Sequence, residues 1–331
     1  MKKGITKILS ACVFAFVVFL AAGTQSKAAV NMGVKQTGAG SSYVDLAWNA
    51  QLGAGHYHTQ FSQDGKNWID MEYSSSPSDS VYNLTQGASY YARVVAYNGS
   101  HYSGTHVMVG VSETAIVSTK PTEVTGLTQT AAGVNSVSMS WNASAGAASY
   151  VIYGYINYNW TQIGTSATNS ATITGVAATT STKFSVAAVK NVTGGTVTGD
   201  QCSGVEMKAI PIKVSRIAMQ YYWDSLKEAK YIWTDVNNAD GYQYEVKSAN
   251  GKKTYFRATS TSSYTYVKPF PRGIFVKARV RAYVTVGNKV YYGAWSPYTY
   301  HASSKKVTAK RSSNGKKIYL KWKKVSGASG Y

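Results

Sequence analysis

The chain has 331 residues, of which 44% are hydrophobic and 15% are charged, and its formal net charge at pH 7 is +20. It contains two cysteines, Cys12 and Cys202. Since Cys12 lies in the N-terminal segment described next, removal of that segment excludes an internal disulfide. A chain of this length can form several hydrophobic cores of ~90 to 100 residues each.

Residues 1–28 have the pattern of a secretory signal peptide. A lysine-rich start precedes an apolar run from residue 8 to 22, and small residues follow up to Ala28, the expected cleavage site. The apolar run has 15 residues, fewer than the ~20 that a spanning helix needs. An uncleaved membrane anchor is the alternative. No later segment is apolar and long enough to span, so we expect a secreted or cell-wall-associated chain with no membrane contact after cleavage.

The first strands of the mature chain are predicted around Trp48. Apolar residues alternate with polar ones at Val44, Leu46 and Trp48, which places one side of a strand in a core. A loop rich in small residues follows, and a second alternating run begins at Tyr57. The dipeptide Asp64-Gly65 then supplies the positive φ of a tight hairpin turn.

This Trp–Tyr unit recurs along the whole chain. A tryptophan is followed nine positions later by a tyrosine at Trp48 and Tyr57, Trp141 and Tyr150, Trp233 and Tyr242, and Trp322 and Tyr331. Successive tryptophans lie 93, 92 and 89 residues apart. Four copies at a near-constant period indicate repeated β modules, with the last copy cut off soon after it begins.

The repeat sets the module boundaries. We expect module 1 over residues 30–118, module 2 over 119–210, module 3 over 211–304, and a truncated start of a fourth module over 305–331. The linkers are very short, which favours semi-rigid rods. The stub after residue 304 has too few strands to bury Trp322, so we expect it not to be a stable domain.

The pattern resembles tandem fibronectin type III modules from secreted and cell-surface proteins of Gram-positive bacteria. Its markers are the period near 90, the Trp–Tyr unit, KPTEVTGL at 120–127 and GAWSP at 293–297. The resemblance covers essentially residues 30–331 and implies an all-β fold of immunoglobulin-like sandwiches in series. It also implies a tyrosine corner at Tyr90, six residues after Leu84. Modules 2 and 3 depart from that pattern, with Thr182 and Val276 at the equivalent position.

No catalytic constellation can be assembled from the sequence. His56 and His58 form an H-x-H pair that could bind a metal weakly. Without a third ligand nearby in sequence, we interpret both as solvent-exposed strand residues. Acidic residues form no close pairs suited to hydrolysis, and Cys202 is interpreted as a small residue near the last strand of module 2. We therefore predict no enzyme activity, catalytic residue, cofactor or metal site within these residues.

Aromatic side chains offer one route to binding. Tyrosines number 27, and exposed rings bind sugars by stacking, although tyrosine also suits half-buried strands in general. The candidate platform residues are Trp68, Tyr73, Tyr153, Tyr155, Tyr158 and Trp160.

The charge is confined to one half of the chain. Residues 29–210 carry seven Lys/Arg and nine Asp/Glu, whereas residues 211–331 carry 23 Lys/Arg and five Asp/Glu. Period-two alternation places Ala278, Val280 and Ala282 inward and a row of cations outward. The candidate polyanion-binding residues are Lys247, Lys252, Lys253, Arg257, Lys277, Arg279 and Arg281. Facing like charges are unfavourable on a sheet, and a bound polyanion would relieve them. The alternative is that these side chains only solvate the sheet and discourage edge pairing.

Three functions remain open at this point. The first is a non-catalytic extracellular spacer with an adhesive surface, whose basic module 3 contacts a polyanion such as teichoic acid or host glycosaminoglycan. The second is the N-terminal part of a large secreted polysaccharide hydrolase or peptidase with its catalytic domain beyond residue 331. The third is a carbohydrate-binding accessory protein. Nucleic acid is not expected as a partner of an exported chain, and the sequence leaves the oligomeric state open.

Overall fold

The computed structural model describes residues 29–331 except 104, 179, 224, 272, 303–306, 324 and 326–331. The predicted signal peptide and Tyr331 lie outside the described residues. No helix among the described residues is long and apolar enough to cross a membrane. The described residues form β-strands and one short 3-10 helix, η1 (His101–Ser103). The all-β fold class predicted from the repeat is confirmed.

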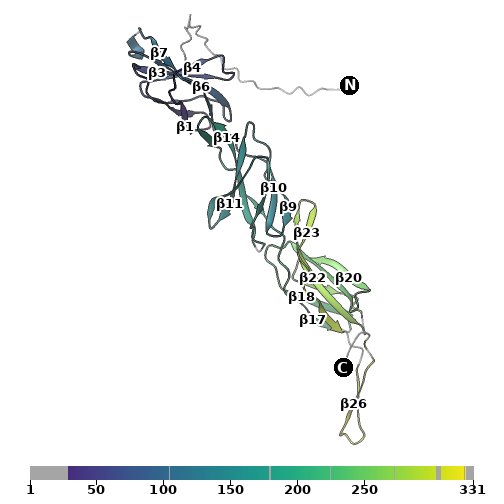
Figure 1. The fold of residues 1–331 in the computed structure, drawn as a ribbon. Coiled ribbons are helices and arrows are strands. Elements are labelled where there is room, and N and C mark those ends of the chain that lie inside the picture. The colour runs from purple at the N-terminus through teal and green to yellow at the C-terminus, as the bar shows by residue number, and fades with distance from the viewer. Residues whose placement is uncertain are drawn as a thin grey trace, which may run out of the picture.

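Each of three consecutive segments folds as an antiparallel sandwich, and the three lie end to end in an elongated rod (Figure 1). In module 1 a three-stranded sheet faces a five-stranded sheet. The first sheet contains β1 (Lys35–Ala39), β2 (Val44–Ala47) and β5 (Ser78–Val81). The second contains β4 (Ile69–Ser74), β3 (His56–Ser62), β6 (Ser89–Tyr97), β7 (Met108–Val111) and β8 (Ala115–Ser118).

Modules 2 and 3 repeat this topology. The small sheets are β9 (Thr128–Gly133), β10 (Ser136–Ser140) and β13 (Ser170–Thr174), and then β17 (Ile217–Trp223), β18 (Glu228–Trp233) and β21 (Tyr264–Val267). The large sheet of module 2 contains β12 (Asn159–Ser166), β11 (Ser149–Ile156), β14 (Thr182–Val192), β15 (Gly195–Thr198) and β16 (Val205–Met207). That of module 3 contains β20 (Thr254–Ser260), β19 (Gly241–Ser248), β22 (Phe275–Val286), β23 (Lys289–Tyr292) and β24 (Thr299–Ala302).

Two contacts fix the spacing of the Trp–Tyr unit in every module: a ring contact between the two residues and a hydrogen bond from the loop between them. In module 1 the rings of Trp48 and Tyr57 meet edge to face with centroids 5.4 Å apart, and the corresponding distances in modules 2 and 3 are 5.3 and 5.5 Å. The Tyr57 hydroxyl accepts a hydrogen bond from the Gln51 amide in the intervening loop, at 3.1 Å. Tyr150 and Tyr242 accept equivalent bonds at 3.0 and 2.8 Å. Each unit thus fills the core with one ring and fixes a loop with the other.

The tyrosine corner of module 1 is confirmed. Tyr90 is buried, and its hydroxyl accepts a hydrogen bond of 3.0 Å from the Thr85 amide. The predicted turn at Gly65 has a positive φ angle of 71°, and Gly251 in the corresponding turn of module 3 has one of 78°.

The last strand of every module is broken at the same place. In module 1 the hydroxyl of Ser112 accepts a hydrogen bond of 2.9 Å from the Val94 amide, and Ser296 does the same for Val280 in module 3 at 3.0 Å. In module 2 the Sγ atom of Cys202 takes this place, 3.3 Å from the Val186 amide. Cys202 is therefore a buried structural residue of the strand break.

The junction between modules 1 and 2 is held by direct bonds. The Thr193 amide donates to the Ile116 carbonyl at 2.8 Å, and the Ile116 amide donates to the Thr193 hydroxyl at 2.7 Å. Lys190 of module 2 is 4% exposed, and its ammonium donates to the Gly87 carbonyl of module 1. At the second junction Lys208 and Asp240 form an ion pair of 2.7 Å. These contacts account for the in-line arrangement of the three modules. The rigidity of the rod stays a prediction.

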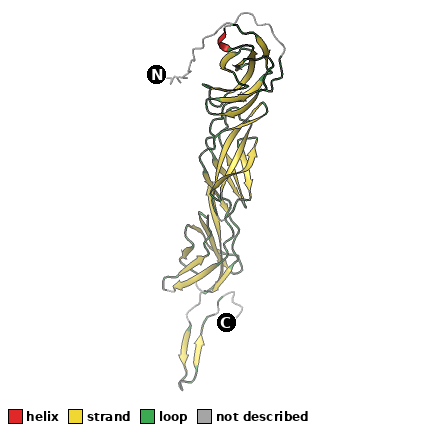
Figure 2. Ribbon diagram, turned by 90° about the vertical axis from the view of Figure 1, so that its left-hand side faces the viewer, coloured by secondary structure: helices red, strands yellow, loops and turns green. Residues whose placement is uncertain are grey.

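After module 3 the described chain forms only a hairpin of β25 (Thr308–Arg311) and β26 (Ile318–Lys321), and every residue of these two strands is exposed. The side chain of Trp322, unlike those of the three earlier tryptophans in the repeat, is 44% exposed. Figure 2 shows the hairpin standing apart from module 3.

Candidate functional site

The predicted basic residues of module 3 do gather on the outer face of its large sheet. Lys277, Arg279 and Arg281 lie in a row on β22, opposite Lys247, Glu245 and Gln243 of β19. Arg257 lies opposite Glu245 from β20, whereas Lys252 and Lys253 are exposed in the β19–β20 turn. We call Lys247, Arg257, Lys277, Arg279 and Arg281 the module 3 basic face. The residues predicted to point inward from β22 are buried.

The sequence suggested that these cations face one another without a counter-charge. The structure instead places the carboxylate of Glu245 among them. This carboxylate is fully buried beneath the cations and pairs with Arg257 and Arg279, each at 2.6 Å, and with Lys247 at 3.2 Å. Burial alone would raise the pKa of Glu245, but the hydrogen bonds from these three side chains together lower the pKa to about 2. Alternation along β19 places Glu245 on the outer side of the sheet, but it does not reveal that long cationic side chains cover it.

Aromatic rings lie between the three cations of β22. The Arg281 guanidinium lies 3.9 Å from the Tyr292 ring centroid and 4.4 Å from that of Trp295. Arg279 follows between Trp295 and Tyr298, at 4.3 and 4.8 Å, and the Lys277 ammonium lies 4.6 Å from Tyr298. Each such contact contributes ~0.5 to 1 kcal/mol at an exposed site. The face therefore keeps excess positive charge but is not an array of unpaired cations.

The opposite sheet of module 3 carries a cluster that sequence reasoning missed. We call Tyr221, Trp223, Lys230, Tyr264 and Tyr266 the module 3 aromatic face. Tyr221, Lys230 and Tyr266 lie in one row across β17, β18 and β21. Their neighbours Ala229, Tyr231 and Val267 are buried, so the row lies on the outside.

The rings of the aromatic face are close together and accessible. Trp223, Tyr264 and Tyr266 are 47%, 44% and 47% exposed. The Tyr221 and Trp223 rings have centroids 4.4 Å apart, and the Lys230 ammonium lies 5.0 to 5.8 Å from the three tyrosine rings. A hydrogen bond with Tyr266 raises the pKa of Tyr221 to about 12, so the Tyr221 phenol stays neutral at physiological pH. Such a surface combines flat apolar faces with hydroxyl donors, the groups that bind sugar rings.

The aromatic platform predicted from the sequence is scattered. Trp68 lies under the Arg93 guanidinium at 4.1 Å, and Tyr73 stacks on His101. Tyr155 and Trp160 form an exposed pair across the β11–β12 hairpin with centroids 5.3 Å apart, and Tyr158 at its turn is 90% exposed. Tyr153 lies on the same hairpin and is half-buried. These residues do not form one continuous surface.

The interpretation of His56 and His58 as exposed strand residues is wrong. His56 is 2% exposed and His58 is half-buried. The connection from β6 to β7 brings His101 to them, so that the candidate ligand atoms of the three side chains all lie within 4.8 Å of one another. Burial lowers the pKa of His58 below its ordinary value; Asp70 opposes this, and the other three imidazoles of module 1 lower the pKa further.

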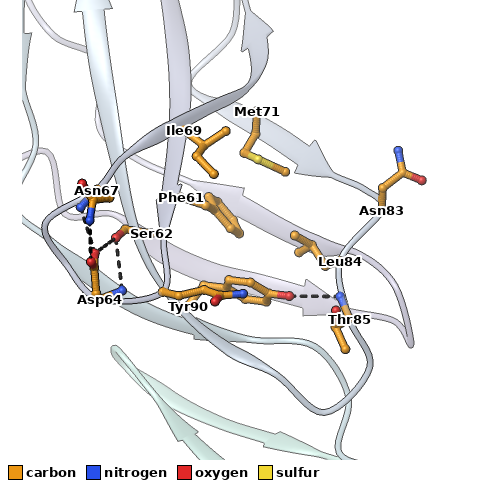
Figure 3. Close-up of a pocket in the computed structure, with 11 residues that line it drawn as sticks. Phe61, Ser62, Asp64, Asn67, Ile69, Met71, Asn83, Leu84, Thr85 and Tyr90 are labelled. Atoms are coloured by element: carbon orange, nitrogen blue, oxygen red, sulfur yellow. Dashed lines mark hydrogen bonds between the residues drawn. The ribbon is translucent and has the colours of Figure 1, made fainter. Parts of the chain in front are cut away.

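A groove opens the core of module 1 to one side. Figure 3 shows Phe61 and Tyr90 at its centre, with Ile69, Met71 and Leu84 around them. At its rim, the Asp64 carboxylate accepts hydrogen bonds of 2.8 Å from the Lys66 and Asn67 amides and 2.7 Å from the Asn67 side chain. These polar residues of the rim therefore stabilise the turn. The groove itself is an open end of the sandwich core.

No protein-family model matches the chain. Among curated proteins it is similar to chitinase A1 of Niallia circulans, with 33% identity over 162 residues, which is 46% of this chain and 22% of the chitinase. The chain thus spans less than a quarter of that relative's length. Among solved structures it is similar to the chicken CNTN1 FN1-FN3 domains, with a TM-score of 0.34 and 15% identity over 83% of this chain and 98% of that chain. The repeated topology of the three modules agrees with the series of fibronectin type III-like sandwiches expected from the sequence.

Proposed function

We propose that this chain is a non-catalytic, extracellular rod that binds polysaccharide through the aromatic face of module 3, while modules 1 and 2 act as spacers. The observation that carries the proposal is the row of exposed rings around Lys230. Four aromatic side chains gather on one outward face, and three of them are more than two-fifths exposed. Clusters of exposed apolar side chains often mark ligand-binding surfaces.

The match to chitinase A1 supports a polysaccharide as the ligand class. The N-terminal pattern of a secretory signal supports a location on the cell surface or in the medium. The direct bonds at the first junction support a spacer role, because they oppose free rotation of module 2 against module 1. A Gram-positive source fits these features and is part of the proposal.

Salt distinguishes this function from contact with a polyanion. The purified protein is mixed with insoluble chitin, with bacterial peptidoglycan and with immobilised heparin, at low salt and at ~0.5 M salt. Binding by ring stacking should persist at high salt on chitin or peptidoglycan. Binding that occurs only on heparin and is lost at ~0.5 M salt would contradict the proposal.

Polyanion contact through the basic face and the adjoining lysines of the β19–β20 turn is the second candidate. It is favoured by five cations against the single carboxylate of Glu245, which leaves excess positive charge even after the ion pairs are counted. Replacing the exposed Lys252 and Lys253 with Ser should weaken heparin binding and leave chitin binding unchanged. These two lysines make no ion pair with Glu245, so the substitutions leave the buried carboxylate paired.

A third candidate is that the chain is part of a polysaccharide hydrolase whose catalytic domain lies beyond residue 331. The chitinase relative is more than four times longer than the matched stretch, which supports this idea. Reading the gene past codon 331 tests it directly. An open frame encoding a hydrolase domain would make the rod the spacer and binding portion of that enzyme, whereas a stop codon would exclude it.

A further inference from the structure

Four histidines and two tyrosines gather at one end of module 1. Strand β6 begins at Ser89, next to module 2, and ends at Tyr97, so the end of the module that carries the histidines is the one far from module 2. Figure 2 shows η1, which contains His101, at this end of the rod. His56 and His58 start β3, and His106 follows η1. The ring of His106 lies 5.1 Å from that of His56.

The environment of His56 leaves one nitrogen without a partner. Its Nδ1 lies 3.1 Å from the Gly99 carbonyl, and because a carbonyl can only accept, Nδ1 carries the proton. The Nε2 atom of neutral His56 then has a lone pair, yet it is buried and has no hydrogen-bond partner. An unsatisfied buried acceptor is costly. A backbone carbonyl that fixes the tautomer of an imidazole is the usual outer partner of a metal-binding histidine.

The distance between the nitrogens of the other two imidazoles matches that between two ligands of one metal ion. His58 Nε2 lies 3.3 Å from His101 Nδ1. Two nitrogens bound to one tetrahedral Zn²⁺ at about 2.0 to 2.1 Å are separated by about 3.3 to 3.4 Å. One candidate ligand nitrogen from each of the three histidines lies within 4.8 Å of the other two, so closure around an ion requires a movement of roughly 1 Å.

The surrounding rings hold the candidate ligands in place. The His101 ring stacks on Tyr73 with centroids 4.1 Å apart and an interplanar angle of 6°. The His56 ring stacks on Tyr97 at 5.3 Å and 14°. These contacts restrict the imidazoles before any ion binds, which lowers the entropy lost on binding.

We propose that His56, His58 and His101 form a three-histidine site for a divalent transition-metal ion of the Zn²⁺ type. Imidazole nitrogen suits Zn²⁺, Cu²⁺ and Ni²⁺ and does not suit Ca²⁺ or Mg²⁺, which take oxygen ligands. A bound ion would tie the start of β3 to the β6–β7 connection. This site is independent of the polysaccharide face, which lies two modules away.

The test is a zinc titration of the untagged protein after removal of metal with EDTA, in competition with a chromogenic chelator. We expect one Zn²⁺ per chain. His101→Phe keeps an aromatic ring that can stack on Tyr73 but removes both nitrogens. Since loss of an outer hydrogen-bond partner alone can weaken metal binding up to ~100-fold, loss of this ligand should weaken it at least ~100-fold. His58→Ala should have a similar effect.

His301→Ala is the matched control, because it removes a half-buried imidazole of module 3 that lies beside Tyr231 and outside the cluster. This variant should bind Zn²⁺ as the unmodified protein does. The proposal is overturned if no saturable binding occurs below about 1 mM, or if His101→Phe binds as tightly as the control. Tighter binding of Cu²⁺ at the same site would support it, since Cu²⁺ exceeds Zn²⁺ at most nitrogen sites.

Discussion

The Nε2 atom of His58 lies 3.3 Å from Nδ1 of His101, although the two residues are 43 positions apart in the chain. The connection between β6 and β7 brings them together, at the end of module 1 that is remote from the other modules. These two nitrogens form a hydrogen bond with each other, while Nε2 of His56 has no partner. A single ion would satisfy all three nitrogens.

Binding of Zn²⁺ should therefore stabilise module 1. An ion that binds only the folded module raises its melting temperature as the free concentration rises above the dissociation constant. We expect the melting temperature of the calorimetric transition assigned to module 1 to rise with added Zn²⁺. It should return to its original value after EDTA is added. The same additions should leave the transitions of His101→Phe unchanged, and an equal shift in that variant would argue against this site.

The Glu245 carboxylate should make module 3 sensitive to acid. Its pKa is about 2 in the folded module and 4.5 ordinarily. Because the folded value is the lower one, the stabilisation is complete above pH 4.5 and is lost as the pH falls toward 2. The difference amounts to about 3 kcal/mol.

Urea unfolding of module 3 at several pH values checks this, with Glu245→Gln as the reference for all other carboxylates. The unmodified protein should be more stable than the variant at pH 7, and the two should converge near pH 2. Parallel pH profiles would mean that Glu245 does not contribute in this way.

Cys202 should tolerate replacement by serine. Serine occupies the same strand break in modules 1 and 3 and accepts the same amide hydrogen bond there. Cys202→Ser should change the free energy of unfolding of module 2 by less than about 1 kcal/mol. Cys202→Leu should cost more, about 1 to 3 kcal/mol, because the site is closely packed. Denaturant unfolding measures both, and a larger loss for Ser than for Leu would refute the equivalence of the three positions.

Lys190 should control the angle between modules 1 and 2. Its buried ammonium donates to Gly87 across the junction, and such charge-assisted bonds contribute about 1.5 to 3 kcal/mol. Lys190→Ala should shorten the average particle in small-angle X-ray scattering. Lys183→Ala removes an exposed lysine from the same strand and serves as the control. Superimposable scattering profiles for the two variants would show that the junction does not depend on Lys190.

The sequence was sufficient for the features that local spacing determines. Trp48 and Tyr57 lie on adjacent stretches of chain, so their distance in the sequence fixes the loop that joins the two sheets. Alternation on β22 likewise predicted that Val280 points inward and Arg279 outward, because side chains on a strand alternate.

The remaining features depend on partners that one sequence does not reveal. Tyr221 and Tyr266 meet only because β18 lies between their strands, and nothing in the local pattern identifies that neighbour. Glu245 occupies an outward position but is covered, because Arg257 and Arg279 reach over it from both adjacent strands. His101 belongs to a connection without strand periodicity, so its approach to His58 could not be predicted from spacing.

The most direct test of the proposed function is a binding isotherm on insoluble chitin at ~0.5 M salt, where contacts between exposed charges are screened. The unmodified protein is compared with the double variant Trp223→Ala and Tyr266→Ala, and with Tyr300→Ala, which removes an exposed ring from the other sheet of module 3. Loss of each stacked ring should cost about 1 kcal/mol or more. We predict saturable binding that the double variant loses and the Tyr300→Ala control keeps. Equal binding by all three proteins would contradict the assignment of the aromatic face as the polysaccharide site.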